Sequence, residues 1–64
     1  MRINGENFKL QAPCILLHFL EQKGCALDRV AVELNGKIIP KNLYESTHVN
    51  DSDSIEIVSF IGGG

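Results

Sequence analysis

The chain has 64 residues, which suffices for one domain with one small hydrophobic core. Six basic residues stand against eight acidic ones, giving a net charge of −2, and no lysine or arginine cluster is present. Because nucleic-acid binding needs a basic surface for the phosphates, we expect no nucleic-acid partner. Almost every apolar side chain is needed for the core, which leaves little for a deep substrate cavity. The composition therefore argues against a conventional enzyme.

The reactive side-chain types give no sign of a metal site or of export. Cys14 and Cys25 are too few and too widely spaced for zinc, and we expect both to be reduced thiols. His18 and His48 have no further ligands at metal-binding spacing, so we interpret them as structural residues. Residues 1–6 contain no apolar run of signal-peptide length, and no stretch is long enough to span a membrane. We expect a cytoplasmic protein without a metal or a membrane contact.

Two Asn-Gly dipeptides, Asn4-Gly5 and Asn35-Gly36, predict tight β-hairpins. Both positions of such a turn need positive φ, which asparagine tolerates and glycine adopts freely. The strands that they would join are residues 1–4 with 7–11 and residues 30–34 with 37–39. Alternation in residues 30–34 places one face of that strand in a core.

One helix is predicted between the hairpins. Pro13 suits a helix start, where its missing N–H costs nothing. Apolar residues at spacings of three and four predict a helix of about nine residues over 15–23. Gly24 is a typical residue just after a helix end, and Lys23 suits the negative end of the helix dipole.

The segment after Pro40 predicts loops and a short edge strand. Residues 41–47 have no clear period, and Leu43 with Tyr44 could anchor a loop or a 3₁₀ turn. His48-Val49 predicts a brief edge strand, and residues 51–53 predict a turn capped by carboxylates. A protein partner with a basic face would match the nearby acids, which are Asp51, Asp53 and Glu56.

Residues 54–60 predict the last strand, with two different faces. Ile55 and Ile57 lie on one face, whereas Val58 and Phe60 lie on the other. The order of hairpin, helix and further strands predicts an α+β fold of the ubiquitin-like β-grasp type. A mixed sheet of four to five strands would carry one main helix on one face. We expect a single domain over residues 1–60 and a flexible glycine-rich reactive tail over residues 61–64.

A single helix covers only one face of such a sheet. Val58 and Phe60 would then form an apolar patch on the open side, continued by Ile61, and we predict that this patch docks partner proteins. The alternative is that loop residues such as Leu43 and Tyr44 cover them.

The chain ends in Gly62-Gly63-Gly64, which stability does not require. One interpretation is a frayed end or an expression remnant. The other is that Gly62 and Gly63 thread a narrow channel and carry the Gly64 carboxylate into a partner's active site. The four residues after Phe60 reach about 13 Å when extended. The ionised carboxylate is a poor electrophile until adenylation gives it a leaving group, and sulfur can then attack. Gly64 is thus the candidate reactive residue, and no side chain of this chain needs to catalyse the step.

The chain resembles the ThiS family of thiamine-biosynthesis sulfur carriers over essentially its whole length, and three segments carry this resemblance. They are Val32-Glu33-Leu34-Asn35-Gly36-Lys37-Ile38-Ile39-Pro40-Lys41, Asp51-Ser52-Asp53-Ser54-Ile55-Glu56-Ile57 and Phe60-Ile61-Gly62-Gly63-Gly64. Tyr44 stands where this family tends to carry an aromatic residue. Ser52 departs from the family's Asp-Gly-Asp turn and would be strained if it needs positive φ. Cys14 stands where serine or threonine would usually cap the helix.

The resemblance implies three partners and no bound cofactor. They are an adenylating enzyme related to ubiquitin activators (ThiF-like), a cysteine desulfurase or other persulfide donor, and a thiazole synthase (ThiG-like) that accepts the sulfur. ATP would belong to the adenylating enzyme. Sulfur carriers for molybdopterin synthase, cysteine synthesis or tRNA thiolation remain alternatives. So do a non-covalent interaction module and a conjugated ubiquitin-like modifier. We expect the free chain to be a monomer.

Overall fold

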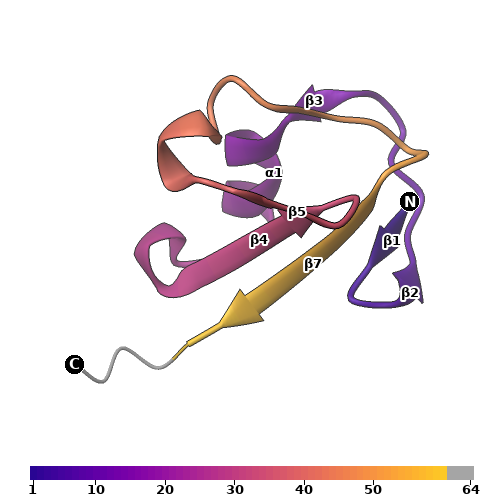
Figure 1. Ribbon diagram of the computed structural model, residues 1–64. Coiled ribbons are helices and arrows are strands. Elements are labelled where there is room, and N and C mark those ends of the chain that lie inside the picture. The colour runs from indigo at the N-terminus through magenta and orange to yellow at the C-terminus, as the bar shows by residue number, and fades with distance from the viewer. Residues whose placement is uncertain (61–64) are drawn as a thin grey trace.

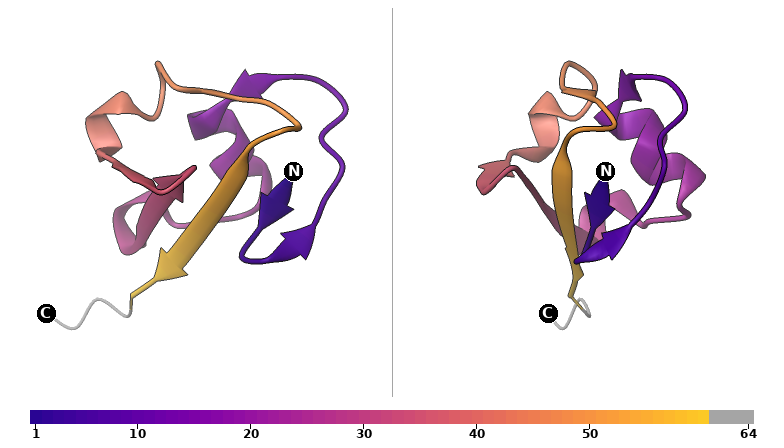
Figure 2. Two further views of the ribbon diagram at one scale, coloured as in Figure 1. Left: turned by 45° about the vertical axis from the view of Figure 1, so that its right-hand side comes forward. Right: turned by 90° about the vertical axis from the view of Figure 1, so that its right-hand side faces the viewer.

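The computed structural model describes residues 1–60. The elements in chain order are β1 (Arg2–Ile3), β2 (Glu6–Asn7), β3 (Cys14–Ile15), α1 (Leu16–Gln22), η1 (Leu27–Arg29), β4 (Val30–Leu34), β5 (Lys37–Ile39), η2 (Lys41–Leu43), β6 (His48–Val49) and β7 (Ser54–Ser59), where η1 and η2 are 3₁₀ helices. Five strands form a mixed sheet in the order β2-β1-β7-β4-β5, with β1 and β7 parallel and the other neighbours antiparallel. Helix α1 packs on one side of this sheet (Figures 1 and 2). The predicted α+β, ubiquitin-like β-grasp fold is confirmed.

Both predicted Asn-Gly hairpins are present. Asn4 and Asn35 each have φ of 52°, and Gly5 and Gly36 each have φ of 84°, as two-residue turns of this handedness require. The first hairpin is shorter than the sequence predicts, because its second strand is only Glu6–Asn7 and not residues 7–11. The Phe8 N–H still donates to the Met1 carbonyl oxygen at 2.9 Å. Beyond Phe8 the chain leaves the sheet.

Helix α1 begins later than the pattern predicts. Cys14 and Ile15 form β3, which pairs with β6, so the helix covers Leu16–Gln22 instead of residues 15–23. No side chain caps its start; instead the Leu16 N–H donates to the Thr47 carbonyl oxygen at 2.7 Å. The Leu17 N–H likewise donates to the Tyr44 carbonyl oxygen at 3.0 Å. The loop before β6 therefore satisfies helix N–H groups that would otherwise lack acceptors, and neither Pro13 nor Cys14 takes the capping role.

The predicted end of the helix at Gly24 is confirmed. Gly24 has φ of 76°, and its N–H donates to the Glu21 carbonyl oxygen at 3.0 Å. The Cys25 N–H donates to the Leu20 carbonyl oxygen at 3.1 Å. These two bonds form a Schellman motif, which satisfies carbonyl groups at the helix end.

The core lies between α1 and the sheet and is closed by the loop segments. Its buried members come from α1, β4, β6, β7 and the loop after η2: Leu16, Phe19, Leu20, Val30, Val32, Tyr44, Val49 and Ile55. His48-Val49 is the predicted short strand, although its pairing with β3 outside the main sheet was not predicted. Tyr44 is buried, and this desolvation raises the pKa of its hydroxyl group.

Ser52 is not strained. Among the non-glycine residues in the described part of the chain, positive φ occurs at Asn4 and Asn35 only. The turn before β7 is closed instead by its flanking residues. The Asp53 N–H donates to the Asn50 carbonyl oxygen at 3.0 Å, and the Asn50 N–H donates to Asp53 Oδ2 at 2.7 Å. A glycine is therefore not required at this position.

The two turn asparagines hold β7 from both sides. Asn4 Oδ1 accepts from the Ile57 N–H at 2.7 Å, and Asn4 Nδ2 donates to the Ile57 carbonyl oxygen at 3.2 Å. From the other hairpin, Asn35 Oδ1 accepts from the Ser54 N–H at 2.9 Å. Asn4 thus continues the hydrogen bonding along β7 past the end of the short strand β1.

Replacing Asn4 with alanine should lower the free energy of unfolding by about 2 kcal/mol, because both side-chain hydrogen bonds are lost and alanine tolerates positive φ poorly. Asn4→Gly keeps the backbone freedom and should cost only about 1 kcal/mol. Urea denaturation followed by circular dichroism measures both values. Equal stability of N4A and the wild type would contradict this role of the side chain.

Candidate functional site

Part of the predicted site lies outside the described residues. Ile61, predicted to dock, and Gly62, Gly63 and Gly64, predicted to thread and to react, follow residue 60, so these assignments stay predictions. Phe60 is the last described residue, and its N–H donates to the Arg29 carbonyl oxygen at 2.9 Å. This bond continues the antiparallel ladder of β4 and β7 by one residue. The chain is therefore tied to the sheet as far as Phe60.

The predicted division of the last strand into two faces is present. Ile55 is fully buried and Ile57 is half-buried on the side of α1. Val58 is 59% exposed and Phe60 is 50% exposed on the other side. Because both side chains remain this exposed, the alternative that loop residues such as Leu43 and Tyr44 cover them is wrong, and Tyr44 belongs to the core instead. Their role in docking stays a prediction, but both side chains are accessible for it.

Ile38, on the edge strand β5, was missed by the sequence reasoning. It is 75% exposed, and the register places it opposite Glu33 of β4, which in turn lies opposite Glu56 of β7. The sequence signal was weak, because period two places the adjacent Ile38 and Ile39 on opposite faces without showing which of them is exposed. We call the side of the sheet away from α1 the open face. Its members on β4, β5 and the β7 segment include Ala31, Glu33, Ile38, Glu56, Val58 and Phe60.

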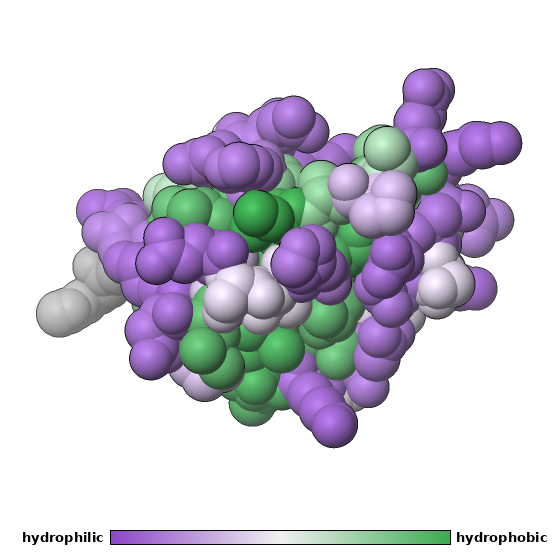
Figure 3. Space-filling model, turned by 90° about the horizontal axis from the view of Figure 1, so that it is seen from above, coloured by the Kyte–Doolittle hydropathy of each residue, from purple (hydrophilic) through white to green (hydrophobic). Residues whose placement is uncertain are grey.

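The molecular surface agrees with an uneven distribution of apolar groups. Seen from above, hydrophilic side chains cover most of the upper, left and right edges, and hydrophobic ones gather in the middle and lower parts of the view (Figure 3). The lower side of that view corresponds to the side that faces the viewer in Figure 1, where the sheet is not covered by α1.

Two of the three acids expected to meet a basic partner are used within the chain. Asp51 Oδ1 accepts from the Leu10 N–H at 2.7 Å and pairs with the Met1 α-ammonium group at 3.1 Å. The pKa of Asp51 is lowered below its ordinary value. The main cause is the hydrogen bond from the Leu10 N–H, followed by the bond to the Met1 ammonium group. Asp53 accepts from the Asn50 N–H and from Asn35 Nδ2. Of the three, Glu56 remains available on the open face.

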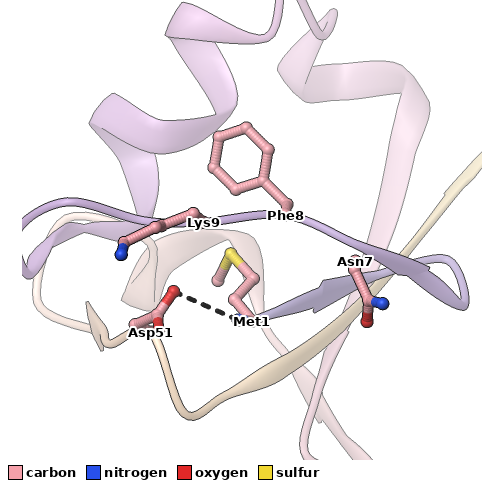
Figure 4. A pocket seen from close by; sticks show the side chains of 5 residues that line it. All are labelled: Met1, Asn7, Phe8, Lys9 and Asp51. Atoms are coloured by element: carbon pink, nitrogen blue, oxygen red, sulfur yellow. Dashed lines mark hydrogen bonds and ion pairs between the residues drawn. The ribbon is translucent and has the colours of Figure 1, made fainter.

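The ion pair of Met1 and Asp51 borders a shallow depression of about 340 Å³, lined also by Asn7, Phe8 and Lys9 (Figure 4). It lies near the start of β7, whereas Phe60 follows the other end of that strand (Figure 1). The depression is therefore remote from the predicted reactive terminus, and we assign it a structural origin.

Residues 1–60 contain no group of three His, Cys, Asp or Glu side chains that could hold a metal ion. His18 and His48 are both exposed, on α1 and β6. Cys14 and Cys25 are free, half-buried thiols that pack against the core. In the described part of the chain, no helix has the length and apolar character needed to cross a membrane.

The fold, the open face and the terminal glycines define a small ubiquitin-like β-grasp protein. A model of the ThiS family matches residues 8–64, and the chain belongs to this family. The crystal structure of the thiamine biosynthesis protein (ThiS) from Geobacter metallireducens superposes with a TM-score of 0.84 at 29% identity, over 98% of this chain and 96% of that one. The resemblance seen in the sequence is therefore confirmed, and membership supports a sulfur-carrier role.

Two further relatives differ in length. The protein named ycf40 of Porphyra purpurea is 38% identical over 64 residues, which is 100% of this chain and 90% of the relative. A thiazole synthase of Paramagnetospirillum magneticum is 45% identical over 62 residues, which is 97% of this chain but 19% of the relative. Nearly the whole of this chain is thus similar to a small part of that synthase.

Acid should destabilise the fold partly through Asp51. Because the pKa of this carboxylate is lowered in the folded chain, its contribution is present above the unfolded pKa and is lost as the pH falls below about 4. Asp51→Asn should therefore be less stable than the wild type near neutral pH and should lose less stability on acidification. Urea denaturation at a series of pH values measures this. Glu21→Gln, an exposed change on α1, is the control, and identical pH profiles of D51N and the wild type would refute the assignment.

Proposed function

We propose that this chain carries sulfur for thiazole formation in thiamine biosynthesis, as a protein co-substrate whose reactive group is the Gly64 carboxylate. The single observation that carries the proposal is the ThiS-family match, which runs from residue 8 through Gly64 and so includes the terminal glycines. The chain acts as substrate and handle, and the partner enzymes supply the catalysis.

The chemistry at the terminus proceeds in three steps. The carboxylate is ionised at neutral pH and must first be activated. It attacks the α-phosphorus of ATP on the adenylating enzyme, and pyrophosphate leaves. Persulfide sulfur from a cysteine desulfurase or similar donor then attacks the carbonyl carbon, and AMP leaves. The product is an acyl disulfide that joins the chain to the sulfur donor. A further thiol then attacks the donor's sulfur atom, so that a disulfide forms on the donor and the terminus leaves as a thiocarboxylate. ATP is bound by the partner, and this chain binds no cofactor.

The acceptor is best assigned to a thiazole synthase. In the Paramagnetospirillum magneticum protein of that name, a segment similar to nearly all of this chain shares one polypeptide with a much longer remainder. Joining two activities in one polypeptide raises their effective concentration, which favours partners that must meet.

The open face supports a docking mode that leaves the terminus free. Val58, Phe60 and Ile61 would contact the partner, and Gly62 and Gly63 would thread toward its active site. The ladder bond from Phe60 to Arg29 fixes the point from which the terminal residues extend. About 13 Å of extended chain after Phe60 separates the docked body from the reacting carbonyl group.

Incubation with an adenylating enzyme, ATP and a persulfide source should replace one oxygen atom of the chain with sulfur. Intact-protein mass spectrometry detects this change. Deleting Gly64 should abolish turnover, because the remaining terminus falls one residue short, while the melting temperature stays unchanged. Absence of the mass change with an enzyme set that modifies a known carrier would refute the proposal.

Replacing Val58 with serine should weaken docking by about tenfold, or ~1.4 kcal/mol, seen as a raised KM for the carrier in the adenylation reaction. Stability should change little because Val58 is exposed. Leu43→Ser on η2 is a matched control, since Leu43 is an exposed apolar residue outside the sheet. Equal KM values for V58S and L43S would exclude Val58 from the docking surface.

A further inference from the structure

The centre of the open face carries two acids in direct cross-strand register. Glu33 of β4 lies opposite Glu56 of β7, and Ile38 of β5 lies opposite Glu33 on the other side. Side chains in such a pair start from Cβ atoms about 4.5–5.5 Å apart, and like charges at this distance destabilise a sheet. The register therefore places two acidic side chains next to each other on an otherwise partly apolar surface.

No cation of residues 1–60 neutralises this pair. The ion pair found in the described part of the chain joins Met1 and Asp51 and involves neither Glu33 nor Glu56. Arg2, the neighbouring basic residue on β1, directs its guanidinium group to the Gly5 carbonyl oxygen at 2.9 Å. The other acids near β7, Asp51 and Asp53, already have partners within the chain. The charge that remains unmatched on the open face is thus concentrated at one place.

Apolar side chains frame the two carboxylates. Ile38 lies beside Glu33, and Val58 follows Glu56 by two residues on the same face. Ile38 and Val58 are among the most exposed large apolar residues of the described chain. A partner that covers them removes water from the acids, which strengthens attraction to a matching cation and penalises a partner without one.

We propose that the open face binds a partner protein whose surface places an arginine side chain between Glu33 and Glu56, with apolar contacts to Ile38 and Val58 around it. A guanidinium group carries five donors in a planar fork and can bond two carboxylates at once. A second copy of this chain is a poor occupant, because stacked open faces would bring four carboxylates together. The inference deepens the proposed function and rests on it, since the partner is the thiazole synthase.

The test is calorimetric titration of the full-length wild-type chain and of the Glu33→Gln/Glu56→Gln variant with the thiazole synthase of the same organism, without ATP or sulfur donor. The variant should bind at least tenfold more weakly, and the difference should shrink at high salt. Its melting temperature should stay the same or rise, because repulsion between the acids is removed. Glu21→Gln/Glu45→Gln removes the same charge outside the sheet and should bind like the wild type.

Several results would overturn the inference. Equal affinity of the two double variants for the synthase would mean that Glu33 and Glu56 affect binding only through the net charge of the chain. A lower melting temperature of E33Q/E56Q would show that the pair is stabilised within the chain. Self-association of the wild type in sedimentation, lost in E33Q/E56Q, would assign the face to a second copy. If the wild type does not bind the synthase, this inference and the acceptor assignment fail together, whereas mass spectrometry still tests activation of Gly64 independently.

Discussion

The alternation of side chains along β7 is the constraint on which the rest of this small protein depends. The strand is central in the sheet, with β1 parallel on one side and β4 antiparallel on the other. Ile55 closes the core beneath α1, while Glu56 and Val58 are fixed on the opposite face by the same pleat. A shift of one residue in register would exchange the two faces. The register of β7 therefore determines both which side chains pack in the core and which are exposed on the open face.

Hydrogen bonds between residues that are far apart in the sequence stabilise helices and strands that are too short to be stable by themselves. Helix α1 has seven residues, and its first N–H groups are satisfied by carbonyl groups of the loop before β6. Strand β1 has two residues, and the Asn4 side chain that follows it supplies the next hydrogen bonds to the backbone of β7. A chain of this size buries too little apolar surface to tolerate unpaired backbone groups. Such bonds across the fold therefore compensate for its short elements.

Local signals in the sequence predicted the features that local physics controls. Both Asn-Gly turns, the end of α1 at Gly24 and the two faces of the last strand followed from propensities at single positions or from period-two alternation. The helix start was wrong because pairing of Ile15 with His48 is a tertiary contact that no helical period reveals. The exposure of Ile38 was missed because a three-residue edge strand gives too few positions to assign its faces. Likewise, the sequence does not reveal that the Asp51 carboxylate accepts a hydrogen bond from the Leu10 N–H, whereas Glu56 has no such bond in the described part of the chain.

The parallel pairing of β1 with β7 has a consequence for how the protein is made. Arg2 and Ser54 are register partners, and the bond between Asn4 and Ile57 spans 53 positions of the chain. Contacts of such sequence separation form late, because the intervening chain must lose its entropy first. On the ribosome, the first strand must therefore wait until β7 has emerged before it can pair. A product that stops before β7 would lack the strand that lies between β1 and β4, so nothing would join its two hairpins into one sheet.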